Sequence, residues 1–170
     1  MIDVRATDGL HWRAMTSSDL AAVDAIAARV HPDYPEDTSV FAERLRLHSE
    51  GCRILAAAAV VGYVISHPWH LGPPPALNVL IGSIPEAAST YYIHDLALLP
   101  EARGSGAAVG IVTMLVAHAR KLGLPSVSLV AVNGSAPFWA KQGFAVVGEP
   151  ADHKLMSYGA DARLMRRHLA

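Results

Sequence analysis

The segment best suited to do chemistry is residues 94–110, with the sequence HDLALLPEARGSGAAVG. An apolar stretch leads there into Arg103-Gly-Ser-Gly-Ala-Ala, and a helical pattern follows. A helix N-terminus presents unpaired backbone N–H groups and a partial positive charge, and both suit the oxygens of a phosphate or diphosphate. Small residues let such a group approach the backbone closely. The segment therefore predicts a phosphate-binding loop at a strand-to-helix junction.

Three interpretations of the glycines compete. Gly104 and Gly106 could simply form a turn. The spacing Gly104-x-Gly106-x-x-x-Gly110 is also a variant of the dinucleotide fingerprint, which needs an acidic residue at the end of the next strand. That strand, residues 126–132, is followed by Asn-Gly instead, which disfavours this interpretation. The third interpretation is a loop that holds the pyrophosphate of coenzyme A.

Residues 103–108 match a (Gln/Arg)-x-x-Gly-x-(Gly/Ala) motif, and with it the chain resembles the GNAT family of N-acetyltransferases. Residues 96–98, Leu-Ala-Leu, resemble that family's cofactor-holding strand, and residues 133–144 resemble its (N)xxAxxxYxxxGF segment. The resemblance covers nearly the whole chain and is strongest over residues 91–144. It implies an α/β fold with a mixed sheet of six to seven strands and about four flanking helices, and acetyl-CoA as co-substrate.

The resemblance also implies which residues contact acetyl-CoA. The amides from Gly104 to Val109 would hold the pyrophosphate, with Arg103 at the mouth, and backbone groups of Leu96 and Leu98 would hold the pantetheine arm. These are backbone roles, so the side chains need only be small or apolar. The expected cofactor contacts are Leu96, Ala97, Leu98, Arg103, Gly104, Ser105, Gly106, Ala107, Ala108, Val109, Asn133, Ala136 and Trp139.

An amine acceptor must lose a proton, because an alkylamine with a pKa of about 10 is almost wholly protonated at neutral pH. The resemblance places the base on the strand before the loop, Tyr91-Tyr92-Ile93-His94-Asp95. Since side chains alternate along a strand, Tyr92 and His94 should share one face, and Tyr91 and Asp95 the other. Histidine is the residue type whose ordinary pKa lies near neutrality, so His94 is the expected general base, with Tyr92 behind it. The structural alternative is a packed His94 bonded to a carbonyl.

The segment 31–37, HPDYPED, follows the first predicted helix, and the resemblance places this loop beside the acceptor. Its carboxylates could attract a cationic amine, or could belong to a solvated acidic loop. We expect Tyr34, Glu36 and Asp95 to contact the acceptor, which would be a small-molecule or peptide amine.

Trp139 departs from the family pattern, in which a Tyr often protonates the departing thiolate. An indole N–H donates a hydrogen bond but releases no proton at ordinary pH. Either the thiolate leaves without a general acid, or Tyr92 or Ser135 assists, and Trp139 then packs against the pantetheine arm. The missing Tyr also keeps open a second function class, a non-catalytic module that binds acyl-CoA as a sensor or partner.

Composition limits the remaining possibilities. The 170 residues suit a single domain over 1–170, and a net charge of −1 gives no electrostatic reason to bind nucleic acid or an anionic membrane. No apolar stretch approaches the ~20 residues of a membrane span. The lone Cys52 suits a buried strand in a reducing compartment. We expect a cytoplasmic monomer or homodimer without a metal, since His67 and His70 have no carboxylate or Cys beside them.

The elements that position these residues follow from hydrophobic periodicity and from Gly and Pro breakers. Strands are predicted over 10–14, 52–59, 60–67, 91–98, 126–132, 144–147 and 162–168, and helices over 17–30, 38–51, 104–122 and 135–141. One strand–helix–strand crossover lies among hairpins, so the sheet should be mixed. Residues 67–90 are rich in Pro and predict a loop, with one or two helical turns at 76–81. A connection this long is unusual unless it is functional.

Overall fold

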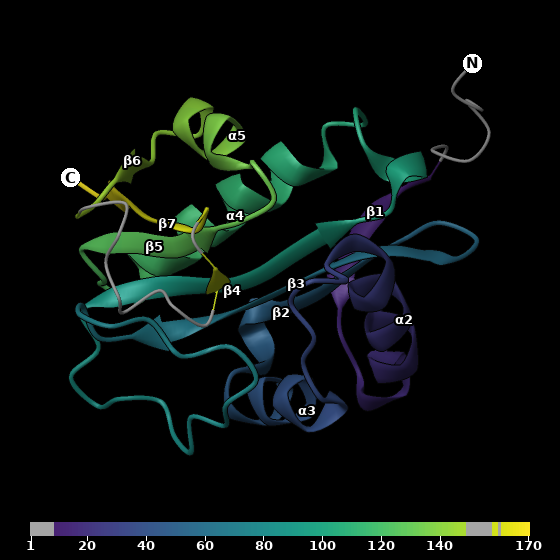
Figure 1. The fold of residues 1–170 in the computed structure, drawn as a ribbon, viewed down its shortest axis with the longest axis horizontal. Helices are drawn as coiled ribbons and strands as arrows, with labels where there is room; N and C mark the ends of the chain where they lie inside the picture. The colour runs from purple at the N-terminus through teal and green to yellow at the C-terminus, as the bar shows by residue number, and fades with distance from the viewer. Residues whose placement is uncertain (1–8, 149–157, 160) are drawn as a thin grey trace.

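The protein, represented by a computed structural model that describes residues 9–148, 158–159 and 161–170, is built on one mixed sheet. Its seven strands have the order β1-β2-β3-β4-β5-β7-β6 (Figure 1). The strands are β1 (His11–Ala14), β2 (Cys52–Ala56), β3 (Val60–Trp69), β4 (Thr90–Leu98), β5 (Ser126–Ala131), β6 (Ala145–Val146) and β7 (Arg163–His168). The helices are α2 (Leu20–Val30), α3 (Thr38–Leu47), α4 (Ala107–Lys121) and α5 (Ala136–Lys141), with 3-10 turns η1 (Ser17–Asp19), η2 (Ser49–Gly51) and η3 (Pro100–Ala102). The predicted mixed sheet and its number of flanking helices are confirmed.

The pairing of β4 with β5 decides where a site can form. All other neighbouring strands of the sheet run antiparallel, whereas β4 and β5 are parallel and are joined by α4. They pair only where residues 91–93 face residues 127–129, and beyond this point they part. Ligand sites in open α/β sheets lie at the carboxyl ends of such strands. Figure 1 shows β4 turning away from β5 toward β1.

Apolar residues at helical spacing bury one stripe of each long helix against the sheet. On one face, α2 and α3 pack their Val23, Ile26 and Phe41 side chains against β2 and β3. On the other face, α4 packs against β4, β5 and β7 through Ile111, Val112, Leu115, Val116 and Ala119. Leu122, the last residue of the predicted helix, lies beyond the end of α4 and is 43% exposed.

Many element ends differ from the predicted ones by one or two residues, and larger differences occur in α4, β2 and α3. Helix α4 begins at Ala107 rather than 104, because Gly104 and Gly106 have φ of 76° and 85°, which no α-helix contains. Strand β2 ends at Ala56 rather than 59, where a turn leads into β3. Helix α3 ends at Leu47, and the predicted remainder is the 3-10 turn η2.

The long loop between β3 and β4 has no helical turn, so the prediction for 76–81 is wrong. Asn78 has a φ of 58°, which interrupts a helix. The loop's backbone N–H groups are taken by side chains instead. The carboxylates of Glu36 and Glu43 accept from the N–H groups of this segment, which are those of Asn78, Ile81 and Gly82.

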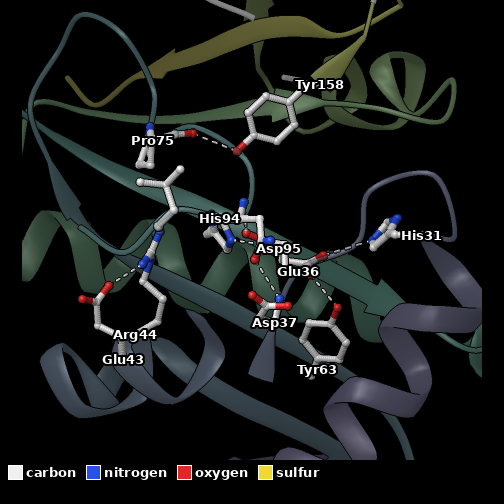
Figure 2. A network of polar contacts seen from close by, with 12 residues as sticks. His31, Glu36, Asp37, Glu43, Arg44, Tyr63, Pro75, His94, Asp95 and Tyr158 are labelled. Atoms are coloured by element: carbon white, nitrogen blue, oxygen red, sulfur yellow. Dashed lines mark hydrogen bonds and ion pairs between the residues drawn. The ribbon is translucent and has the colours of Figure 1, made fainter. Parts of the chain in front are cut away.

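This loop is fastened to α3 by a buried ion pair. Arg44 is fully buried, and its guanidinium lies 2.7 Å from Glu43 Oε1. The same guanidinium donates to the carbonyl of Val79 at 3.2 Å. The Tyr158 hydroxyl donates to the carbonyl of Pro75 at 2.9 Å from the other side (Figure 2). Polar side chains from three parts of the chain thus fix a segment that has no regular structure of its own.

Candidate active site

A cavity of about 740 Å³ opens where β4 and β5 part. The residues singled out from the sequence that line it are His94, Asp95, Leu96, Leu98, Arg103, Gly104, Ser105, Gly106, Ala107, Ala108, Val109, Asn133, Ser135 and Trp139. Ala97 is buried on the opposite face of β4, against Tyr63, and Ala136 packs into the core under α4. Neither of these two lines the cavity, and neither do Tyr34, Glu36 or Tyr92.

A β-bulge at His94 shapes the cavity wall. In the pairing of β3 with β4, Ser66 faces Ile93 and Ile65 faces Asp95, so His94 is the extra residue. A bulge leaves such a residue outside the ladder and bends the strand. The His94 side chain is only 1% exposed although the residue lines the cavity, so its backbone faces the cavity.

The bulge also overturns the predicted alternation of side chains along β4. Beyond it the side chains change faces, so Asp95 points to the face covered by α2 and α3, where Tyr63 and His31 bond it. Tyr92, which pairs with His67, lies on this same face, and Tyr91 lies in the core under α4. The prediction that Tyr91 and Asp95 share a face is therefore wrong.

The loop before α4 has the geometry of an anion cradle. Gly106 is the left-handed residue before the first helical turn, and the Ser105 hydroxyl donates to the Ala102 carbonyl at 2.6 Å. Among the described residues, no protein group accepts a hydrogen bond from the backbone N–H of Ala108 or Val109. A Cβ placed on Gly106 meets no atom within 4 Å, so the space over these amides is open. Free amides at a helix N-terminus attract anions.

Two side chains hold this loop in place. Arg103 donates from Nε to the Leu98 carbonyl at 3.2 Å, which ties the loop back to the end of β4. Trp12 of β1 donates from Nε1 to the Ala107 carbonyl at 3.0 Å and fixes the start of α4. The open amides are therefore held in position before any ligand arrives.

His31, which the sequence did not single out as a base, lies in the cavity wall beside Asp95. Its Nε2 is 3.0 Å from Asp95 Oδ1, and its Nδ1 is 3.0 Å from the side-chain amide nitrogen of Asn133. An amide NH₂ only donates, so Nδ1 accepts, and the neutral ring carries its proton on Nε2, which donates to Asp95. Figure 2 shows Asp95 bonded to His31 on one side and to Tyr63 on the other.

Burial and hydrogen bonding act in opposite directions on this pair. Burial disfavours the charged form of each group, which lowers the pKa of His31 and raises that of Asp95. Their mutual hydrogen bond and attraction outweigh burial, so the pKa of His31 is raised and the pKa of Asp95 is lowered. Asp95 is an anion that favours protonated His31, which is the arrangement of a base with its orienting carboxylate.

His94, the predicted base, has a different environment. Its Nε2 lies 2.7 Å from Glu36 Oε1, and its Nδ1 is buried and has no hydrogen-bond partner among the described residues. The second carboxylate oxygen of Glu36 accepts from the N–H of Asn78 at 2.9 Å. Glu36 is thus engaged by His94 and by the long loop, and its side chain is only 5% exposed.

Tyr92 and Tyr34 lie near the site but outside the cavity. Tyr92 is buried, and its hydroxyl interacts with that of Tyr158, although no hydrogen bond of ordinary geometry joins them. Burial raises the pKa of Tyr92 well above its usual value. Tyr34 packs beside Tyr158 and touches the His31 ring edge-on, with ring centres 6.4 Å apart.

Trp139 and Cys52 both lie in packed surroundings. Trp139 is 6% exposed, lies between Phe138 and Phe144 in edge-on contacts, and turns part of its surface to the cavity. Cys52 is fully buried in β2, and burial raises the pKa of its thiol to about 12, so it is no nucleophile.

Comparison with known proteins agrees with this architecture. The sequence matches the model of the Acetyltransferase (GNAT) family over residues 13–144. No curated protein matches the chain. None of the helices in the described residues is long and apolar enough to cross a membrane.

Solved structures share the fold at low identity. Ard1 from Thermoplasma volcanium is 15% identical, with a TM-score of 0.71 and coverage of 95% of this chain and 99% of that one. A GphF GNAT-like decarboxylase in complex with isobutyryl-CoA is 19% identical, with a TM-score of 0.75 and coverage of 94% and 100%. The ribosomal-protein-S18-alanine N-acetyltransferase from Escherichia coli is 16% identical, with a TM-score of 0.64 and coverage of 95% and 94%. With the family model matching most of its length and the fold in agreement, this chain belongs to the GNAT acetyltransferase family.

Proposed function

We propose that the protein transfers an acetyl group from acetyl-CoA to a primary amine, by direct attack of the amine within a ternary complex. The observation that carries this proposal is the cavity between the parting ends of β4 and β5, which leads to the open amides of α4. Family membership supports acyl transfer, and several structural relatives were solved with CoA or acyl-CoA.

The cavity suits coenzyme A along its whole length. The free N–H groups of Ala108 and Val109 would hold the diphosphate, and the backbone of Leu96 and Leu98 would hold the pantetheine arm. The backbone of His94 at the bulge lies at the inner end of this path. When bound, acetyl-CoA supplies an acyl group already activated as a thioester.

His31 is our candidate for the general base, in place of His94. Both residues line the cavity. The His31 side chain is 15% exposed and lies beside Asp95, whereas the His94 ring is buried and bonded to Glu36. The acceptor amine would take the position of the exposed Asn133 amide at Nδ1 of His31. His31 would then receive the amine proton while Asp95 holds the ring and stabilises its positive charge.

Among the described residues that line the cavity, no Tyr is present to protonate the leaving thiolate. The Trp139 indole releases no proton near neutral pH, and the Tyr92 hydroxyl lies outside the cavity lining. Ser135 lines the cavity and can donate a hydrogen bond. A thiolate with a pKa of about 8.5 is a good leaving group without full protonation, so this arrangement still permits transfer.

The acceptor remains defined only by its chemistry, a small-molecule or peptide amine. Asp95 lines the cavity and its negative charge can attract a cationic amine, whereas Glu36 lies outside the lining. Tyr34 and Tyr158 border the same region. Among the relatives, Arabidopsis thaliana Naa50 was solved with a CoA–peptide bisubstrate analogue and an N-acetylglutamate synthase with N-acetyl-glutamate. We infer a cytoplasmic enzyme that acts as a monomer or homodimer.

A free-thiol assay tests this function. Acetyl-CoA and isobutyryl-CoA are each offered with polyamines, amino acids, aminoglycosides and peptides, and acetyl-CoA binding is measured by calorimetry. Thiol release that requires both acetyl-CoA and an amine supports the proposal. Tight binding without turnover supports the alternative function, an acyl-CoA-binding module, which the Trp at position 139 favours. Absence of both binding and turnover overturns both.

A further inference from the structure

Three potential metal ligands meet on the surface away from the cavity. His48 follows the last turn of α3, Glu50 lies in η2, and His118 lies on α4. Helices α3 and α4 cover opposite faces of the sheet (Figure 1), so the cluster joins the two layers. None of the three residues lines the cavity between β4 and β5.

The distances within the cluster match a metal centre. His48 Nε2 lies 3.3 Å from His118 Nε2, and Glu50 Oε2 lies 3.7 Å from His118 Nε2. Imidazole nitrogens bind Zn²⁺ at about 2.0–2.1 Å, so two of them in a tetrahedral site lie about 3.3–3.4 Å apart. The three ligand atoms all lie within 4.8 Å of one another, and the Glu50 side chain is 69% exposed, which leaves it room to turn toward both nitrogens.

The rings are held facing each other by their surroundings. Each packs edge-on to the ring of Tyr91, with ring centres 5.8 Å away for His48 and 5.4 Å away for His118. Without a metal, one Nε2 must carry a proton and donate it to the other. With a metal, both protons move to Nδ1 and both Nε2 lone pairs point at the ion.

We propose that His48, Glu50 and His118 form a surface site for Zn²⁺ or a similar divalent transition metal, completed by water. Two imidazoles and one carboxylate suit such ions better than Ca²⁺ or Mg²⁺, which prefer oxygen ligands. Arg53 and Lys121 lie close enough to act on His118 electrostatically, and these cations moderate the affinity. The bound ion would tie the end of α3 to α4, so its expected effect is on stability and not on acyl transfer.

The test uses protein without a histidine tag. Calorimetry with ZnCl₂ should give one saturable site per chain, and Zn²⁺ should raise the midpoint of thermal unfolding. His48→Gln and His118→Gln should each weaken Zn²⁺ binding at least tenfold, and Glu50→Gln should weaken it less. His70→Gln is the matched control, because His70 is exposed and lies outside the cluster, and it should bind Zn²⁺ like the parent.

Co²⁺ provides a readout on the unaltered chain. Intense visible absorption on adding CoCl₂, lost on competition by Zn²⁺, is expected from a four-coordinate site with nitrogen ligands. The proposal is overturned if the parent shows only the weak bands of hydrated Co²⁺. It is equally overturned if His118→Gln, folded by circular dichroism, binds Zn²⁺ as tightly as the parent. Neither result bears on the proposed acetyl transfer.

Discussion

His31 Nε2 and Asp95 Oδ1 lie 3.0 Å apart in the wall of the cavity, although their residues belong to distant parts of the sequence. The contact exists because the bulge at His94 turns Asp95 toward the loop after α2. The Tyr63 hydroxyl donates to the other Asp95 oxygen and fixes the carboxylate. One irregular residue in β4 thereby creates a histidine–carboxylate pair at the place where β4 and β5 part.

His31→Ala should lower kcat/KM at pH 7 by about 10²–10⁴-fold, the usual range for general base catalysis. The loss should shrink at high pH, where more of the acceptor amine is already neutral. Acetyl-CoA affinity, measured by calorimetry, should change little, because the amides proposed to hold the diphosphate belong to α4. His94→Ala is the matched comparison and should lose much less activity if it stays folded.

A larger loss of activity in His94→Ala than in His31→Ala would identify His94 as the base. An active His31→Ala enzyme together with an inactive but folded His94→Ala enzyme would contradict our assignment. Full activity in both variants would point to a water molecule held by backbone carbonyls as the proton acceptor.

Asp95→Asn should shift the pH dependence in a defined direction. Asp95 raises the pKa of His31 by stabilising the imidazolium, whereas burial alone lowers it. Without the carboxylate, the rising limb of kcat/KM, which follows deprotonation of His31, should move to lower pH. The His31 ring protons should titrate at the same lower pH by NMR. A limb that stays in place in this variant would mean that another group titrates.

Most of the fold could be predicted because its signals are local. Apolar residues at helical spacing mark α2 and α4, and Gly and Pro residues mark their ends. The loop of residues 103–109 could be predicted for the same reason, since a backbone cradle needs consecutive small residues. The helical turns that the sequence predicts at 76–81 are absent, because the carboxylates of Glu36 and Glu43, far away in the sequence, accept from the loop's N–H groups.

The pairing of His31 with Asp95 could not be predicted from local patterns. Strict alternation puts Asp95 on the same face as Tyr91, and nothing in the sequence around His94 shows that an extra residue interrupts the pairing. His31 follows α2 and meets Asp95 only through the tertiary fold. The local signal for His31 is its place at the start of the HPDYPED loop, where the carboxylates are the more obvious groups to meet an amine.

Gly106→Val should weaken acetyl-CoA binding strongly while the chain stays folded. The added side chain would stand in the open space over the α4 amides, and φ at this position is 85°, a conformation that β-branched residues avoid. Gly110→Ala is the control, because a Cβ there meets no atom within 4 Å and the residue lies outside the cavity lining. It should bind normally and be stabilised by about 0.5–1 kcal/mol. Unchanged affinity in Gly106→Val would exclude the phosphate-loop assignment.

Trp139→Phe should leave turnover within a few-fold of the parent, because the indole packs between Phe138 and Phe144 and transfers no proton. The thermal midpoint should fall, since a buried side chain becomes smaller. Steady-state kinetics and calorimetry separate the two effects. A loss of about 10²-fold or more in kcat with acetyl-CoA affinity preserved, the effect expected for an acid or base, would show that the indole takes part in the chemistry.

The last prediction concerns His67, which is fully buried beside Tyr92 and Trp69. Its Nδ1 donates to the Pro68 carbonyl at 2.9 Å, and its Nε2 has no partner among the described residues. Burial lowers its pKa to about 3, against about 6.5 in an unfolded chain. Between these values the unfolded state binds more protons, so stability falls as the pH falls from about 6.5 toward 3.

His67→Phe should remove this contribution, which reaches about 1.4 kcal/mol per pH unit for one group. Urea unfolding between pH 7 and pH 4 should show a shallower loss of stability in the variant than in the parent. His48 and His118 also have lowered pKa values and act in the same direction, so some slope should remain. His70→Phe, at an exposed site, should keep the parental slope. Equal slopes in His67→Phe and the parent would mean that His67 is protonated in the folded protein or that its environment opens to water before the chain unfolds.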